Sequence, residues 1–178
     1  MWTIIKKEVK SYFLSPIAYI FIGLFLFMNS IFFYLDVYAI GRVNFEYMFG
    51  SLATVLTFVV PILTMRMFAE ERKNGTEQIL YTSPRSITSI VLGKFLAATT
   101  IMVICEVFTL MYLGILKYFG QPHISTALVT LLGFLLLSMA YIAFGMFASS
   151  ITENQIIAGV ITIAGLLVIW LMPSFYSS

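Results

Sequence analysis

Long uninterrupted apolar runs dominate the hydrophobic pattern of this chain. They cover residues 17–35, 47–65, 95–116, 124–148 and 156–172. A helix rises about 1.5 Å per residue, so about 20 apolar residues cross the roughly 30 Å hydrocarbon layer of a membrane. The runs lack the alternation of apolar and polar residues that membrane β-strands show. The pattern therefore predicts an all-α fold, a single polytopic domain over residues 1–178 with five transmembrane helices.

The composition excludes two other classes of protein. Of the 178 residues, 61% are hydrophobic and 10% are charged, and the mean hydropathy is +1.00. A soluble domain typically has about 45–50% apolar and about 25% charged residues, and a disordered chain needs low hydrophobicity with high charge. Neither class fits, which leaves an integral membrane protein. The net charge of +2 is too small to indicate nucleic-acid binding.

The positions of the basic residues predict the orientation of the spans. Of the 10 Lys and Arg residues, Arg42 and Lys117 fall on one side of the five spans, and the other eight fall on the opposite side. Those eight are Lys6, Lys7, Lys10, Arg66, Arg72, Lys73, Arg85 and Lys94. Because cytoplasmic loops carry the excess of Lys and Arg, the N-terminus is expected to be cytoplasmic.

Residues 1–16 combine an apolar stripe with a basic face. Apolar residues recur at helical spacing with lysines between them: Trp2, Ile5, Val9, Tyr12 and Phe13, with Lys6, Lys7 and Lys10. This pattern predicts an amphipathic helix in the membrane interface, in contact with lipid. Ser15-Pro16 is expected to end it, because Pro suits the first turn of a new helix. The alternative interpretation is a basic anchor before the first span.

One long loop, residues 66–94, dominates the expected cytoplasmic side. Residues 66–73 are predicted to continue the second span as a helix that ends at Asn74-Gly75. Thr76 can then cap a second, short helix through Tyr81, and Ser83-Pro84 begins a third helix. The short helix carries apolar side chains with nothing of its own to cover them. It is therefore either a docking site for an intracellular partner or a solvated turn that dips into the membrane interface.

This loop also carries a recognisable motif. Residues 69–84 read AEERKNGTEQILYTSP, and residues 91–95 read VLGKF. The motif resembles the membrane subunits of type-2 ABC transporters, which have an E-x-x-x-G-T, hydrophobic pair, P and G-K pattern at this place. The resemblance extends to the basic N-terminus and the order of spans, so it covers nearly all the chain. Within that family, the chain looks most similar to permease subunits of gliding-motility and copper-enzyme-maturation systems.

The resemblance implies a permease subunit of a bacterial plasma membrane transporter. Such subunits pair with a second permease subunit, and each docks a separate ATPase that binds the ATP. The short helix after Gly75 would be the coupling helix, and the N-terminal helix would be the connecting helix on the inner membrane surface. The residues that would face or shape the ATPase are Glu71, Arg72, Gly75, Thr76, Glu77, Leu80 and Pro84.

The chain departs from the family pattern in one respect. Members usually have six spans, whereas this sequence stops at Ser178, just past the fifth apolar run. We expect that a sixth span is missing, either because the sequence is a fragment or because the partner subunit completes the bundle.

The inventory of reactive side chains argues against a membrane enzyme. The chain has one cysteine, Cys105, one histidine, His123, and one aspartate, Asp36. These are too few for a zinc site or an aspartyl dyad, and no nucleophile motif accompanies His123. There is also no G-x-x-x-x-G-K-[ST] sequence to hold phosphates. No catalytic residue, metal site or cofactor of its own is therefore predicted for the chain.

Polar residues inside the spans leave a second function open. Glu106 is the single charge well inside a span, and it either lines a pathway or packs against protein, because a charge at mid-bilayer costs about 2.5–3.5 kcal/mol. The alternative function is an ATP-independent, ion-coupled carrier or channel that uses Glu106. Several other side chains are predicted to bond between helices, namely Asn29, Thr54, Thr57 and Thr109. Gly145 and Ser149, four residues apart, are predicted to let two helices approach closely.

Overall fold

The computed structural model describes residues 2–36, 45–76, 86–119 and 123–176, and within these ranges the ordered elements are all helices. The helices are α1 (Trp2–Leu14), α2 (Pro16–Tyr34), α3 (Phe45–Thr64), α4 (Ala69–Lys73), α6 (Ile87–Phe119), α7 (Ile124–Ile151) and α8 (Gln155–Tyr176). The described part of the chain contains 5 helical stretches long and apolar enough to cross a membrane. The predicted all-α bundle with five such helices is therefore confirmed.

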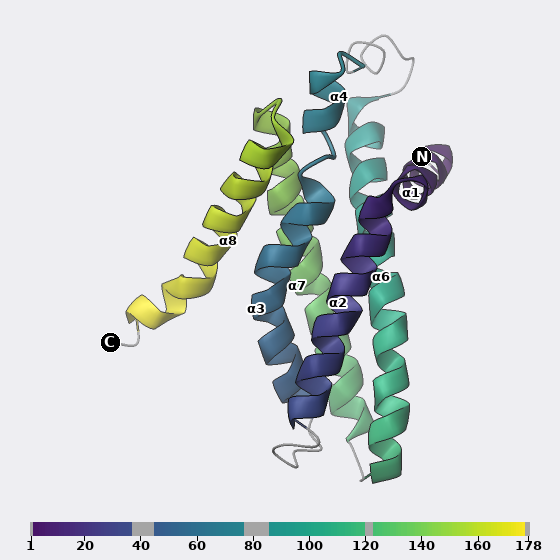
Figure 1. Ribbon diagram of the computed structural model, residues 1–178, viewed down its shortest axis with the longest axis vertical. Coiled ribbons are helices and arrows are strands. Elements are labelled where there is room, and N and C mark those ends of the chain that lie inside the picture. Colours follow the sequence, from purple (N-terminus) through teal and green to yellow (C-terminus); the bar gives the residue numbers. More distant parts are fainter. Residues whose placement is uncertain (1, 37–44, 77–85, 120–122, 177–178) are drawn as a thin grey trace.

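The long helices form a bundle around α3 (Figure 1). α3 packs against α2, α7 and α8, and α6 packs against α2 and α7. α8 diverges from the others toward the C-terminus, whereas α1 is seen almost end-on and so runs across the bundle axis (Figure 1). α1 and α4 lie at the same end of the bundle, called the α4 end below.

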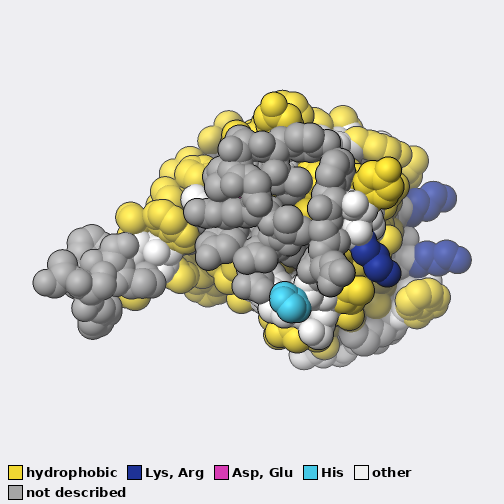
Figure 2. All heavy atoms as spheres, turned by 90° about the horizontal axis from the view of Figure 1, so that it is seen from below, with side chains coloured by type: hydrophobic (Ala, Val, Ile, Leu, Met, Phe, Trp, Pro, Cys, Tyr) yellow, Lys and Arg dark blue, Asp and Glu magenta, His cyan; other side chains and the backbone are white. Residues whose placement is uncertain are grey.

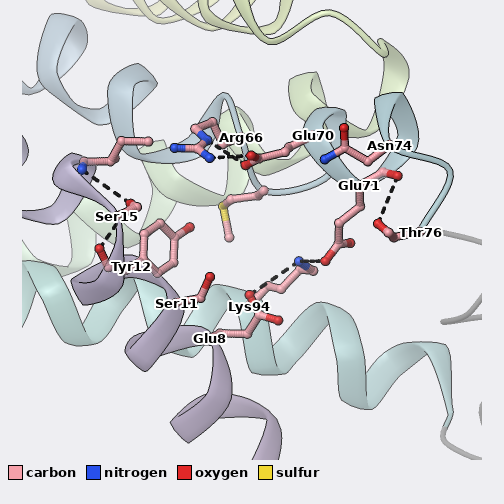
Figure 3. Close-up of a pocket in the computed structure, with 12 residues that line it drawn as sticks. Glu8, Ser11, Tyr12, Ser15, Arg66, Glu70, Glu71, Asn74, Thr76 and Lys94 are labelled. Carbon is pink, nitrogen blue, oxygen red and sulfur yellow. Dashed lines mark hydrogen bonds and ion pairs between the residues drawn. The ribbon is translucent and has the colours of Figure 1, made fainter.

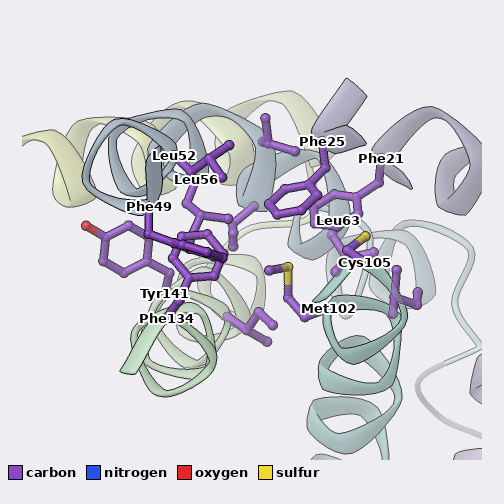
Figure 4. Close-up of a cluster of buried hydrophobic side chains, with 14 of the residues drawn as sticks. Phe21, Phe25, Phe49, Leu52, Leu56, Leu63, Met102, Cys105, Phe134 and Tyr141 are labelled. Atoms are coloured by element: carbon purple, nitrogen blue, oxygen red, sulfur yellow. The ribbon is translucent and has the colours of Figure 1, made fainter. Parts of the chain in front are cut away.

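The core and the flank of the bundle are both apolar. Phe134 of α7 contacts Phe25 of α2 and Phe49 of α3, with ring centroids 6.1 Å and 4.7 Å apart (Figure 4). Seen from the opposite end, the described surface of the bundle is mostly hydrophobic (Figure 2). Because lipid tails are as apolar as the core, tight packing and interhelical hydrogen bonds hold such helices together.

The first helical break occurs where the sequence predicts it. Ser15 is the N-cap of α2, its Oγ accepts a hydrogen bond of 3.4 Å from the Ile17 amide, and Pro16 occupies the first turn. The apolar stripe of α1 does not face lipid alone, because α1 packs along α6 and α2. Tyr12 and Phe13 are half-buried against the core, while Trp2 is 75% exposed.

The helix predicted over residues 66–73 is only partly correct. The chain turns at residues 65–68 and resumes a helix only at Ala69, as α4. The physical reason is a side chain from α7: Ser149 Oγ accepts bonds of 3.1 Å from the Phe68 and Ala69 amides and donates one of 3.2 Å to the Met65 carbonyl. These bonds satisfy backbone groups that a continuous helix would have paired internally.

The predicted end of this segment is confirmed. Asn74 caps α4, and Gly75 has φ of +67°, the left-handed conformation that commonly ends a helix. The amides of Gly75 and Thr76 donate to the Arg72 and Glu71 carbonyls at 3.1 Å and 3.0 Å. The predicted short coupling helix, residues 77–81, and the break at Ser83-Pro84 lie outside the described residues.

Candidate functional site

A polar cavity of about 240 Å³ opens at the α4 end, where α1, α4 and α6 converge (Figure 3). Its lining comes from three stretches of the chain and includes Glu8, Ser11, Tyr12, Ser15, Arg66, Glu70, Glu71, Asn74, Thr76 and Lys94. In a chain with 10% charged residues, such a concentration of charge marks this end of the bundle as the place for polar interactions.

Lys94 is the central cation of this region. Its side chain is 4% exposed, and its Nζ lies 2.7 Å from Glu71 Oε1 and 3.5 Å from Glu8 Oε2. The same Nζ lies 5.4 Å from the centroid of the Phe68 ring, within cation–π range. A buried charge without partners is strongly unfavourable, so the two carboxylates account for the burial of this ammonium group. Glu8, Glu71 and Lys94 are called the Lys94 cluster below.

The residue before Lys94 sets how closely α1 approaches α6. A Cβ placed on Gly93 would lie 2.6 Å from Ile4 Cγ2 and 3.1 Å from Ile4 Cβ, which is closer than real side chains pack. Glycine at this position therefore lets α1 lie directly on α6, and the adjacent residue, Lys94, reaches Glu8. The G-K pair of the motif, which the sequence showed only as a pattern, builds this helix crossing.

A second ion pair lines the cavity. Arg66 Nε donates to Glu70 Oε2 at 2.6 Å, and Arg66 Nη2 pairs with Glu70 Oε1. The two side chains are 28% and 33% exposed and lie four residues apart. Exposed pairs of this kind contribute about 0–1 kcal/mol. Unlike the Lys94 cluster, this pair joins neighbouring turns of one segment and links no separate helices.

Tyr12 closes the cavity on the α1 side. Its hydroxyl donates a hydrogen bond of 3.4 Å to the Leu63 carbonyl of α3. Burial, and after it the nearby negative charge of Glu8, raise the pKa of Tyr12 well above its usual range. Tyr12 therefore remains a neutral hydrogen-bond donor between α1 and α3.

The structure brings four of the residues predicted to contact an ATPase to the α4 end. Glu71 and Arg72 are half-buried on α4, and Gly75 and Thr76 are exposed just after it. Glu71 is turned inward to Lys94, and the Thr76 hydroxyl donates to the Glu71 carbonyl at 3.2 Å. The other three, Glu77, Leu80 and Pro84, lie outside the described residues. The role of all seven remains a prediction.

Sequence reasoning missed the partners of Lys94. The sequence indicates Lys94 only as a basic loop residue and as part of the motif, and it assigns no role to Glu8. The position of Glu8 on the helix is a signal that could have identified it. Glu8 is the acidic residue of a basic segment, and it lies one turn from Ile4, Ile5 and Tyr12, on the packed side of α1.

Glu106 lies inside α6 and is 8% exposed. Among the described residues its Oε1 finds no hydrogen-bond partner, and the same is true of Asn29 Oδ1 and Thr57 Oγ1. Asn29 does donate through Nδ2 to Thr109 Oγ1, at 2.8 Å, so the predicted bond between helices is confirmed for this pair. Both roles of Glu106, packing and pathway lining, stay predictions.

The predicted close approach at Gly145 and Ser149 is confirmed. Ser149 bonds the link between α3 and α4, and a Cβ on Gly145 would overlap the Thr64 side chain of α3.

Within the described ranges, no three His, Cys, Asp or Glu side chains come together in a way that could hold a metal ion.

Comparison with known proteins agrees with the motif. A family model described as "ABC-2 family transporter protein" matches residues 5–178. Neither a curated protein nor a solved structure gives a significant match to the chain. The gliding-motility or copper-maturation subtype remains a prediction. The match covers nearly the whole sequence and all the apolar helices, so the chain belongs to the ABC-2 family of transporter proteins and is a multi-pass membrane subunit for transport rather than a catalytic enzyme.

Proposed function

We propose that this chain is the permease subunit of an ATP-driven transporter of the bacterial plasma membrane. Its N-terminus is cytoplasmic, it pairs with a second permease subunit, and it docks a separate ATPase through residues 74–84. The family match supports a transport subunit, and the ATPase partner follows from the usual assembly of that family. The substrate is left unassigned.

One observation carries this proposal. At the end of α4 the chain changes from inward-facing to outward-facing positions: Glu71 bonds Lys94, whereas Lys73, Asn74 and Gly75 are exposed. α4, which precedes the docking loop (residues 74–84), is therefore held against the bundle while the residues at its end are exposed. A mechanical contact with another subunit requires such a held base beside the contact surface.

The packing around α4 supports a route from this loop into the spans. Ser149 of α7 bonds the link between α3 and α4, and Lys94 connects α4 with α6. On this proposal, closure of the ATPase pair pushes the docking loop, and α3, α6 and α7 tilt as rigid bodies. The chain has no phosphate-binding loop, so the energy of ATP enters only through this contact.

The decisive experiment purifies the full chain and its Leu80→Asp variant from the native membrane and measures the ATPase that co-purifies. We expect the ATPase no longer to co-purify, while membrane insertion is unchanged. Ile87→Asp is the matched control, because Ile87 is 61% exposed at the start of α6, outside the docking loop. Co-purification that is unaltered by Leu80→Asp would contradict the proposal.

A second function is favoured only by the buried Glu106. An ion-coupled carrier or channel would use this carboxyl without ATP. To test this function, the chain alone is reconstituted into proteoliposomes that contain a pH-sensitive dye, and proton flux is measured. Proton flux that Glu106→Gln abolishes would favour this function, and an absence of flux would favour the permease.

A further inference from the structure

The Lys94 cluster links α4 to two helices, α1 and α6, with which α4 does not otherwise pack closely. Among the described helices, α1 packs on α6 and α2, whereas α4 packs on α7 and α8. Neither α1 with α4 nor α4 with α6 is among the closely packed pairs. The ammonium group of Lys94 nevertheless meets a carboxylate from α1 and one from α4 (Figure 3).

We infer that Lys94 is a positioning residue that holds α1, α4 and α6 together and so orients the docking loop that follows α4. The inference rests on the proposed function, because it concerns the orientation of the surface offered to the ATPase. Lys94 itself is 4% exposed, so it acts through Glu71 and Glu8 and does not contact the partner.

The charges explain why this link is specific. Glu8 and Glu71 are both negative, so without the cation between them they would repel each other. Their side chains are 15% and 22% exposed, which weakens the screening of that repulsion by water. Loss of the ammonium group therefore does more than remove one bond, because it turns an attraction between α1 and α4 into a repulsion.

The two contacts of Lys94 differ in strength. The contact with Glu71 is a hydrogen bond of 2.7 Å, whereas the ion pair with Glu8 spans 3.5 Å. α1 is in addition held on α6 by the close contact of Ile4 with Gly93, and α4 has no comparable contact with α6. The position of α4 should therefore depend on Lys94 more than that of α1.

The test measures the distance between α1 and α4 in the permease alone. Spin labels are placed on cysteines introduced at Lys7 and Lys73, both exposed, in a Cys105→Ala background reconstituted into lipid nanodiscs. We expect one narrow distance distribution for the parent protein. Lys94→Met should broaden it and add longer distances, whereas Lys94→Arg should keep it narrow. A distribution that Lys94→Met leaves unchanged would overturn the inference.

Arg66→Met is the matched control. It removes a cation from the same cavity, but its partner Glu70 lies on the neighbouring turn, so the distance should stay as in the parent protein. If Lys94→Met fails to insert, Glu71→Gln takes its place and should broaden the distribution in the same way. The charge exchange Lys94→Glu with Glu71→Lys should narrow the distance distribution again. If Glu71→Gln does not broaden the distribution and the charge exchange does not narrow it, the inference is overturned.

Capture of the ATPase then tests the consequence for docking. In the native membrane, Lys94→Met should reduce co-purification of the ATPase at least roughly fivefold relative to Arg66→Met, the size expected for residues coupled through one network. Unchanged capture would overturn the orienting role. If the unmodified chain captures no ATPase, the proposed function fails, while the distance measurement still decides whether Lys94 holds α1 and α4 together.

Discussion

Gly145 in α7 lies directly against Thr64 in α3, so that a Cβ on the glycine would be 2.8 Å from Thr64 Cβ. Of the two glycines in α7, Gly133 and Gly145, only Gly145 lies against another helix. We expect Gly145→Ala to destabilise the bundle by about 1–3 kcal/mol, because overpacking forces the helices apart. Thermal unfolding in detergent measures the effect.

The control for this substitution lies on the same helix. A Cβ on Gly133 would meet nothing within 4 Å, so Gly133→Ala should leave the stability unchanged or raise it slightly. Equal melting temperatures for the two variants would contradict the packing described here.

Ser149 is expected to hold the link between α3 and α4. Ser149→Ala leaves the Phe68 and Ala69 amides without their acceptor, which should cost about 1–3 kcal/mol. Hydrogen exchange at these two amides should accelerate. Ser150→Ala is the control, because Ser150 is half-buried and its hydroxyl donates within its own helix, to the Phe147 carbonyl. Equal exchange in both variants would show that the link does not depend on Ser149.

The bond from Asn29 to Thr109 should couple α2 to α6. A double-mutant cycle with Asn29→Leu and Thr109→Val is expected to give a coupling of about 0.6 kcal/mol, with about 1.7 kcal/mol as the upper range for such bonds in membranes. The 2.8 Å bond between these side chains is the basis for this value. Additive effects of the two substitutions would mean that the bond does not form.

Gly75 should resist replacement by residues that disfavour positive φ. Its φ is +67°, so Gly75→Val is expected to cost about 1–3 kcal/mol and to fray α4. Gly75→Asn should be tolerated better, because Asn visits this conformation more readily. Hydrogen exchange of the Thr76 amide, which donates to Glu71, reports the fraying. Identical exchange for Val and Asn would contradict the conformation.

The predicted orientation can be tested from both sides of the membrane. A cysteine at the exposed Asn74 should react with an impermeant maleimide in inverted vesicles and remain protected in intact cells. A cysteine at Lys117, at the other end of α6, should show the opposite behaviour. Reaction of Asn74 only from outside would invert the topology and remove the basis for a cytoplasmic ATPase contact.

Local signals made much of the fold predictable. The apolar runs predict the long helices because each run exceeds the thickness of the hydrocarbon layer. Ser15-Pro16 and Asn74-Gly75 predict breaks because their effect depends on neighbouring backbone atoms. The turn at residues 65–68 could not be predicted in this way, because a side chain from α7, more than 80 positions away, stabilises it.

The same limit applies to the candidate site. Lys94 and Glu71 are separated by 23 positions, and Glu8 comes from the far end of the chain. No periodicity connects them, so their meeting depends on how α1 crosses α6. Gly93 was visible as a glycine in a motif, but its role depends on Ile4, which only the packing of the helices reveals.

The length of α6 has a geometric consequence. It is a single helix of 33 residues without an internal proline, so it is about 50 Å long. Lys94 is near one end, and Thr109 lies well toward the other. A pivot of about 5° at the Lys94 end of such a rod would swing its far tip by about 4 Å. A small angular displacement imposed beside α4 thus becomes a shift of atomic dimensions on the opposite face of the membrane.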